Sequence, residues 1–366
     1  MTKSREKKMN THSYSRLLKI TLISITLSLT GNAQALTSQE QFGKAVYFDS
    51  NLSEPAGQAC ASCHDPATGF AEPDQDLPVS EGVIPGRFGG RNAPSASYAV
   101  FFEEFDAKNV RGGQFWDGRA ANLTEQAKGP FLNPVEMNNS SPEQVVQKIA
   151  ASAYADLLVS VCGQDAALAE NTATTYHCIA SAIAAYEGTT EVNPFSSRYD
   201  CVKAGKESFS AVEARGFKLF KGAGKCSNCH SLGGRKSPDL FMDQRYHNLG
   251  LPKNTDYPFT GNEATDLGVG VTVNDPKEYG KFKTEHLRNI AMSAPYMHNG
   301  VLKTLKDVVH FYNTRDVPGL WPAPEYPDTM DGNFMGDLGL NDADENAIVA
   351  FMETLTDGYS CTARAR

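Results

Sequence analysis

Apolar residues recur at helical spacing in two stretches that are far apart in the chain. Ile179, Ile183 and Tyr186 are three or four residues apart, and the same spacing recurs within residues 348–355. Such spacing places the side chains on one face of a helix that packs against a core. The two stretches are also similar in sequence, with Ala-Ile-Ala-Ala-Tyr at 182–186 and Ala-Ile-Val-Ala-Phe at 347–351. We therefore expect two similar closing helices.

Two further helices are predicted by their start signals. Ser38 with Gln41 and Ser210 with Glu213 have the spacing of a capping box, which satisfies free N–H groups in the first turn of a helix. Each predicted helix continues with glycine, three residues and an aromatic residue, Gly43 to Tyr47 and Gly216 to Phe220. The chain thus repeats one order of elements in its two halves.

This repeat predicts an all-α fold of two domains related by duplication. Gly- and Pro-rich segments at 51–91 and 233–273 are expected to be long irregular loops, with little strand beyond a short hairpin. Asn193-Pro194 interrupts the helical pattern between residues 187 and 205. We therefore expect an N-terminal domain at 36–200 and a C-terminal domain at 201–366.

The first 35 residues have the pattern of a secretory signal peptide. Six basic residues precede or flank an apolar stretch, Ile20 to Gly31, and Ala33-Gln34-Ala35 supplies a cleavage site. An uncleaved anchor is the alternative. No other apolar run approaches membrane length, so we expect a soluble mature protein in the periplasm.

The chain is acidic, with a formal net charge of −9, and cleavage of the basic signal segment would make it more so. This balance disfavours nucleic-acid binding. It suits docking of a small basic redox protein, although solubility alone explains the sign equally well.

Two motifs of the form C-x-x-C-H indicate which cofactor the chain binds. Cys60 and Cys63 precede His64, and Cys226 and Cys229 precede His230. Two thiols at this spacing add to the vinyl groups of haem, and the adjacent histidine reaches the iron. Zinc sites are disfavoured because no further C-x-x-C pair completes them. The sequence therefore predicts two covalently bound haem c groups.

Four of the eight cysteines remain after these motifs. An even number in an exported chain predicts disulfides. We expect Cys162–Cys178 and Cys201–Cys361, although four cysteines permit three connectivities.

Several longer motifs accompany the haem motifs, and together they resemble the bacterial di-haem cytochrome c peroxidase and MauG superfamily over nearly all of the predicted mature chain. They are RNAPS at 91–95, QFWDGRA at 114–120, EQAKGP at 125–130, NPVEM at 133–137, LRN at 287–289 and APYMHNG at 294–300.

The resemblance implies a peroxidatic haem on His64 and an electron-transfer haem on His230. It implies that Gln126 and Glu136 act on bound peroxide. Cleavage of the O–O bond requires a proton to move from one oxygen to the other, which a positioned carboxylate can do. Without the motif around it, Glu136 would be taken for a solvated surface acid.

The resemblance assigns further roles. Trp116 would relay electrons between the haems, because an indole is easily oxidised, although a core tryptophan is the plainer interpretation. His298 would lie near the second haem without ligating it. The resemblance assigns no role to His247, for which a structural hydrogen bond is the plainer interpretation. A calcium ion, a hard cation, would be held by oxygen atoms of Asn92, Ser293 and Pro295.

The sequence departs from conventional members at two places. No histidine occurs between His64 and His177, so no loop histidine can cap the first haem, and we expect its sixth position to be open. Tyr312 stands where a methionine usually ligates the second haem, as in the MauG branch. A phenolate there would favour ferric and higher states. Other candidates for this ligand are His310, Met330 and Met335.

The expected function is a periplasmic peroxidase that reduces hydrogen peroxide with electrons from a small cytochrome c or cupredoxin. Three alternatives stay open: a MauG-like enzyme that oxidises Trp or Tyr of a partner protein, a di-haem electron carrier, and an oxygenase. The resemblance makes a homodimer plausible.

Overall fold

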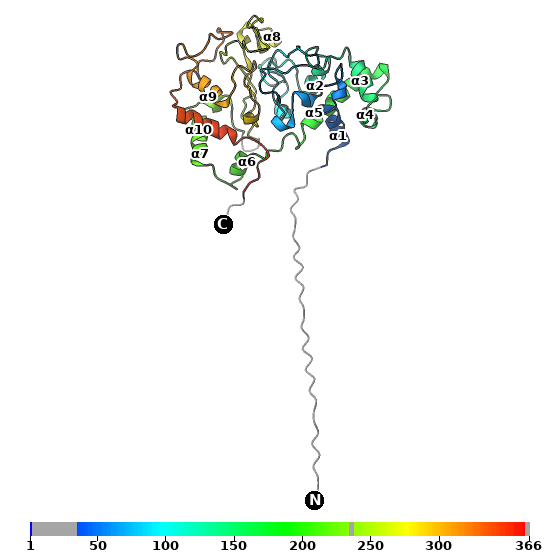
Figure 1. Ribbon diagram of the computed structural model, residues 1–366, viewed down its shortest axis with the longest axis horizontal. Helices are drawn as coiled ribbons and strands as arrows, with labels where there is room; N and C mark the ends of the chain where they lie inside the picture. The colour runs from blue at the N-terminus through cyan, green and yellow to red at the C-terminus, as the bar shows by residue number, and fades with distance from the viewer. Residues whose placement is uncertain (2–34, 234–237, 363–366) are drawn as a thin grey trace. The chain divides into compact units, whose positions relative to one another are not determined.

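The computed structural model describes Met1, residues 35–233 and residues 238–362, so the predicted signal peptide lies almost entirely outside the described residues. Residues 36–366 form one compact unit, and helices dominate its described part (Figure 1). The helices are α1 (Ser38–Tyr47), α2 (Leu123–Leu132), α3 (Pro142–Ala150), α4 (Ala155–Cys162), α5 (Thr172–Glu187), α6 (Arg198–Lys203), α7 (Ala211–Lys221), α8 (Val269–Val273), α9 (Leu305–Thr314) and α10 (Asp342–Glu353).

Strand is confined to one small antiparallel pair in the described part of the chain. β1 (Tyr246–His247) pairs with β2 (Phe282–Lys283), with Tyr246 opposite Lys283. The predicted all-α class with little β structure is confirmed.

The two predicted closing helices are α5 and α10, and each crosses a glycine of an earlier helix. A Cβ atom on Gly43 of α1 would lie 1.8 Å from the carbonyl oxygen of Ala182 on α5. A Cβ atom on Gly216 of α7 would lie 1.8 Å from the carbonyl oxygen of Ala347 on α10. Glycine is therefore needed for the close approach of both helix pairs. The repeated sequence pattern corresponds to a repeated helix crossing.

The start of α7 agrees with its predicted capping box, and the start of α1 does not. Ser210 caps α7 together with Glu213. At α1 the capping residue is Thr37, which pairs with Glu40, so the predicted pair Ser38–Gln41 is wrong by one residue. A carboxylate accepts the backbone N–H of the capping residue, and Glu40 stands at the third position after Thr37.

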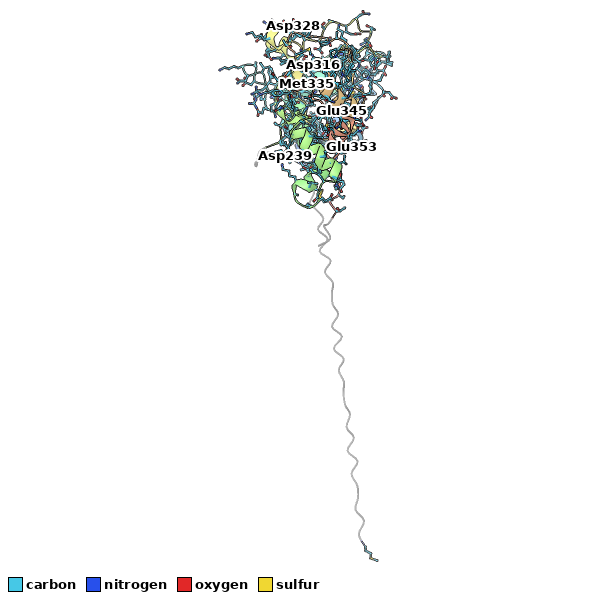
Figure 2. The ribbon with its side chains drawn as sticks, turned by 90° about the vertical axis from the view of Figure 1, so that its left-hand side faces the viewer. Asp239, Asp316, Asp328, Met335, Glu345 and Glu353 are labelled. Atoms are coloured by element: carbon cyan, nitrogen blue, oxygen red, sulfur yellow. A yellow bond between two sulfur atoms is a disulfide. The ribbon has the colours of Figure 1, made fainter. Side chains whose placement is uncertain are left out.

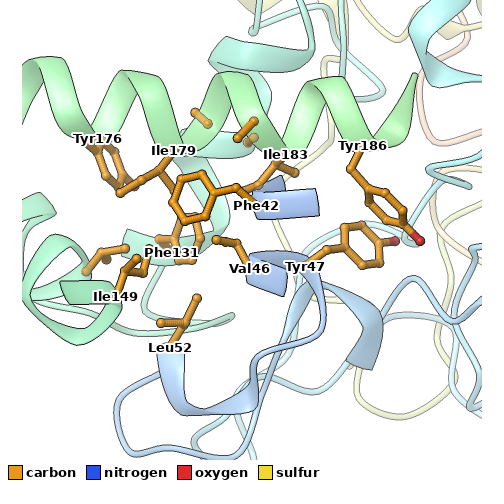
Figure 3. Close-up of a cluster of buried hydrophobic side chains, with 14 of the residues drawn as sticks. Phe42, Val46, Tyr47, Leu52, Phe131, Ile149, Tyr176, Ile179, Ile183 and Tyr186 are labelled. Atoms are coloured by element: carbon orange, nitrogen blue, oxygen red, sulfur yellow. The ribbon is translucent and has the colours of Figure 1, made fainter. Parts of the chain in front are cut away.

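Buried apolar side chains form two clusters, one in each half of the sequence. The first contains Phe42 and Val46 of α1, Phe131 of α2 and Ile179 and Ile183 of α5 (Figure 3). The second is built around α7, α9 and α10. No residue is shared between the clusters, whose members end at Val192 and resume at Tyr199. The division into domains at 200 and 201 stays a prediction, because residues 36–366 form one compact unit.

Both predicted disulfides are confirmed. Cys162 at the end of α4 is bonded to Cys178 of α5, and Cys201 of α6 is bonded to Cys361 near the C-terminus. The four cysteines of the haem motifs take part in neither disulfide.

Among the described residues, no single helix has the length and apolar character needed to cross a membrane. One bent pair, α3 with α4, meets the criterion only when both helices are combined.

Candidate active site

Each C-x-x-C-H motif forms a short 3₁₀ turn on the wall of a cavity. Cys60–Ser62 form the first turn and Cys226–Asn228 the second. Cys60, Cys63 and His64 line one cavity, and Cys226, Cys229 and His230 line the other. The two thiols and the imidazole of each motif therefore face one space, as covalent attachment of a haem requires.

The histidines of the two motifs are suited to bind iron. Nδ1 of His230 lies 2.8 Å from the carbonyl oxygen of Phe241, which leaves Nε2 for a metal. Nδ1 of His64 is buried, and the carbonyl group of His64 accepts a hydrogen bond from the hydroxyl of Tyr47. Burial lowers the pKa of both imidazoles, and a neutral imidazole is the form that ligates a metal. The residues present fit a haem at each site.

Gln126 and Glu136 line the same cavity as His64. Gln126 lies in the middle of α2, and Glu136 follows the end of that helix. The helix begins at Asn122, whose side chain accepts a hydrogen bond from the N–H of Glu125. The structure therefore brings both predicted peroxide-binding residues to one cavity.

The carboxyl group of Glu136 is mostly buried and has one hydrogen-bond donor among the described side chains. Nδ2 of Asn133 donates to its Oε1 at 2.8 Å. Burial raises the pKa of Glu136, and the Asn133 amide and the positive charge of Arg119 lower it. Arg119 also lines this cavity, with its guanidinium 3.6 Å from the ring centroid of Phe115.

The loop without a histidine folds back on itself beside this cavity. Gly82 donates a backbone hydrogen bond to Arg87, and Gly89 donates one to Ser80. Ser80 also bonds the carboxylate of Glu72. Ser80 and Glu81 line the cavity, so the loop presents a hydroxyl and a carboxylate there.

Trp116 lines both cavities. Its indole Nε1 donates a hydrogen bond to the carbonyl of Asn92 at 2.8 Å, and its own carbonyl accepts one from the N–H of Lys283 at 2.9 Å. The indole is therefore fixed between the two haem motifs, where a relay would have to lie.

Tyr312 and His298 line the second cavity together with His230. His298 is stacked on Phe282, with ring centroids 3.5 Å apart. Burial raises the pKa of the Tyr312 phenol, and its hydroxyl makes no hydrogen bond to the described residues.

The other ligand candidates from the sequence do not line this cavity. Nδ1 of His310 lies 3.0 Å from the buried carboxylate of Glu345, and Met335 belongs to the second core cluster (both Glu345 and Met335 are labelled in Figure 2). Met330 packs against Gly250. The geometry favours Tyr312 among the four.

Met297 lines the second cavity and was not predicted from the sequence as a site residue. Its backbone is left-handed, with φ +76°. Nor was Asn133 predicted as the partner of Glu136. The only available signal for Met297 was its place next to His298 in the APYMHNG motif.

His247 makes the structural hydrogen bond that was expected. Nε2 lies 2.8 Å from Oδ2 of Asp243. Burial alone would lower the pKa of His247, but the bond to Asp243 and the nearby Cys229 sulfur outweigh it and raise the pKa to about 10.

The predicted calcium ligands lie in two segments that touch. The N–H of Asn92 donates to the carbonyl of His298, and Nδ2 of Asn92 donates to the carbonyl of Pro78. Ser293 bonds the carbonyl of Ile290, and the Ala294–Pro295 peptide is cis. No described contact joins Asn92 to Ser293 or Pro295 directly, and the calcium site stays a prediction.

Known proteins are similar to this chain in sequence and in fold. A family model described as di-haem cytochrome c peroxidase matches residues 37–208. The chain is 34% identical to the methylamine utilization protein MauG of Paracoccus denitrificans, over 93% of this chain and 95% of that protein. It is 35% identical to cytochrome c551 peroxidase of Pseudomonas aeruginosa, over 74% and 70% of the two chains.

A solved structure agrees with these relatives. The di-haem peroxidase BthA of Burkholderia thailandensis superposes with a TM-score of 0.80 and 32% identity, over 89% of this chain and 87% of that chain. The chain therefore belongs to the di-haem cytochrome c peroxidase and MauG family of oxidoreductases.

Proposed function

We propose that this protein reduces hydrogen peroxide to water in the first cavity, with electrons from a small redox protein. The observation that carries the proposal is that Gln126 and Glu136 line one cavity with His64. Several relatives at 30–35% identity are named cytochrome c or cytochrome c551 peroxidases, which supports the same reaction.

In this proposal each haem is held by the residues of its motif. Cys60 and Cys63 would form thioether bonds to the first haem, with His64 as the ligand of its iron, and Cys226, Cys229 and His230 would hold the second haem in the same way. When bound, the haem iron would supply the electron transfer to peroxide.

The first cavity supplies the proton chemistry. The carboxylate of Glu136 accepts a proton from one peroxide oxygen and returns it to the other, which leaves as water. The amide of Gln126 can orient the peroxide by hydrogen bonding. Two electrons and two protons then complete the reduction of each peroxide molecule to two water molecules.

Trp116 is the proposed electron relay between the two sites. It lines both cavities, and hydrogen bonds at its Nε1 and its carbonyl fix its position. We retain a calcium ion near Asn92 as part of the proposal, because oxygen atoms of Asn92, Ser293 and Pro295 are ligands that suit a hard cation.

A second candidate function is supported by Tyr312. Tyr312 lines the second cavity with His230, and the match to MauG extends over nearly the whole of both chains. A tyrosine ligand would help the second site to hold an oxidising equivalent. In this version the protein would oxidise Trp or Tyr residues of a partner protein.

We also propose that the protein works in the periplasm as an exported enzyme. The signal pattern at 1–35, two covalent haem motifs and two disulfides support an oxidising compartment outside the cytoplasm.

Replacement of Glu136 tests the proposed chemistry. Glu136→Gln keeps the size of the side chain but removes the proton acceptor, so the rate of reaction with peroxide should fall roughly a hundredfold or more. Stopped-flow absorbance of the holoenzyme measures this rate. Glu125→Gln is the matched control, because Glu125 lies on α2, the helix that precedes Glu136, and pairs with Lys128 at the surface. Equal rates in both variants would remove Glu136 from the mechanism.

Steady-state assays distinguish the two versions of the function. A peroxidase should oxidise a reduced small cytochrome c or cupredoxin continuously when peroxide is added. A protein that reacts with peroxide but oxidises neither donor would support the MauG-like version.

A further inference from the structure

We propose that Asn133 is a positioning residue that holds the carboxylate of Glu136 in the orientation in which it accepts a proton. The proposal rests on the role of Glu136 in the proposed function. Asn133 is the C-cap residue that directly follows α2, and it lines the first cavity.

The Asn133 side chain is held by two hydrogen bonds of opposite kind. Its Oδ1 accepts from the N–H of Val135 at 3.2 Å, and its Nδ2 donates to Oε1 of Glu136 at 2.8 Å. Because the backbone N–H of Val135 can only donate, it fixes which end of the amide points toward Glu136. The amide therefore presents its donor to the carboxylate.

The backbone of Asn133 holds the same turn. Its carbonyl accepts hydrogen bonds from the N–H groups of Glu136, at 3.0 Å, and Asn138, at 2.9 Å. The carbonyl of Glu136 in turn accepts one from the N–H of Val83. The Glu136 backbone is thus fixed, and the Asn133 amide fixes the side chain. Oε2 of Glu136 makes no hydrogen bond to the described residues and is the oxygen left for the substrate.

A buried carboxyl group needs such a donor if it is to act as a base. Burial raises the pKa of Glu136, whereas the Asn133 amide and, to a smaller extent, the charge of Arg119 lower it. Cys60 and Cys63 also face Glu136. The remaining titratable groups on the wall of this cavity are His64, Glu81, Arg91, Asp117 and Glu187.

The test separates this donor from the turn around it. Asn133→Asp keeps an oxygen that accepts the Val135 N–H, but it replaces the donor by a second carboxylate oxygen that repels Glu136. Asn138→Asp is the matched control, because Nδ2 of Asn138 donates at 2.8 Å to the carbonyl of Glu54 instead. Both variants remove one amide donor and add one negative charge on the same segment.

The holoenzymes are compared by the pH dependence of their stopped-flow reaction with peroxide. For Asn133→Asp the rate at neutral pH should fall roughly tenfold or more, the worth of a hydrogen bond to a charged group. The rate should rise with pH as Glu136 ionises, and the midpoint of this rise should lie at higher pH than in the wild type. Asn138→Asp should keep the wild-type midpoint.

Equilibrium binding of cyanide gives a second readout that does not depend on turnover. Hydrogen cyanide transfers a proton to a base when it binds, so the pH dependence of its Kd should move in Asn133→Asp as the rate does. If Asn133→Asp does not accumulate as holoenzyme, Asn133→Ser replaces it, because a serine hydroxyl can serve the turn but is too short to reach Glu136.

The outcomes separate the two proposals. Wild-type midpoints for both rate and cyanide binding in the Asn133 variant would overturn the positioning role, while Glu136→Gln would still decide the role of the carboxylate. A wild-type protein that does not react with peroxide would overturn the proposed function itself.

Discussion

The two versions of the function differ in the role of one side chain, Tyr312. It lies on α9 at the wall of the second cavity. Burial raises the pKa of its phenol, so without a nearby cation the side chain stays neutral. A ferric iron in this cavity would supply the positive charge that stabilises a phenolate.

Tyr312→Phe should therefore change the low-spin signal of the second haem while both haems stay attached. Electron paramagnetic resonance of the ferric protein measures this change. Tyr296→Phe is the control, because Tyr296 lines the same cavity but donates its hydroxyl to the carbonyl of Ile290. If the Tyr312 variant kept the wild-type spectrum, the ligand would have to be another residue, and Met297 is one candidate on that wall.

Single residues differ in how far their roles could be predicted. The cysteines and histidines predicted to hold the haems stand in C-x-x-C-H motifs, and the spacing of this motif alone predicts haem attachment. Asn133 could not be identified in this way. Its role depends on which end of its amide faces Glu136, and that is decided by a contact with the Val135 N–H.

At the scale of secondary-structure elements, the stability of the fold depends on two close helix crossings. α1 crosses α5 at Gly43, and α7 crosses α10 at Gly216, each with room for a hydrogen atom only. An added methyl group would force the helices apart, and overpacking of this kind costs about 1–3 kcal/mol.

Gly43→Ala and Gly216→Ala should each lower the free energy of unfolding of the holoenzyme by about this amount. Denaturant or thermal unfolding measures the change. Gly129→Ala on α2 serves as the control, since its Cβ atom would lie 3.5 Å from Phe115, an ordinary contact. That variant should be neutral or more stable by up to about 1 kcal/mol, because alanine favours helices. Equal stability of Gly43→Ala and Gly129→Ala would contradict the tight crossing.

Four helices, α1, α5, α7 and α10, and their order were predictable, because apolar spacing and capping residues are local signals. The other helices of the described part, such as α2 and α3, were not predicted. The boundary error at α1 arose because Ser38–Gln41 and Thr37–Glu40 have the same spacing, and only the structure shows which pair forms the bonds. The paths of the long loops were not predictable. The 79–90 loop is held by contacts such as Val83 with Glu136, which are distant in sequence.

At the scale of the whole molecule, the two halves meet around Trp116. Arg91 pairs with Asp117 in its own half and with Asp266 in the other half, at 2.7 Å in each case. Trp116 lies on the walls of both cavities, so the halves share one residue between their haem motifs. No sequence pattern shows that both cavities converge on one indole, although the family resemblance implied it.

We propose that the first site accepts small ligands while the second is fully coordinated. Electron paramagnetic resonance of the untreated ferric holoenzyme, recorded before and after addition of cyanide, tests this claim most directly. The account predicts one high-spin and one low-spin signal, with only the high-spin signal converted by cyanide. Two low-spin signals that cyanide leaves unchanged would contradict it.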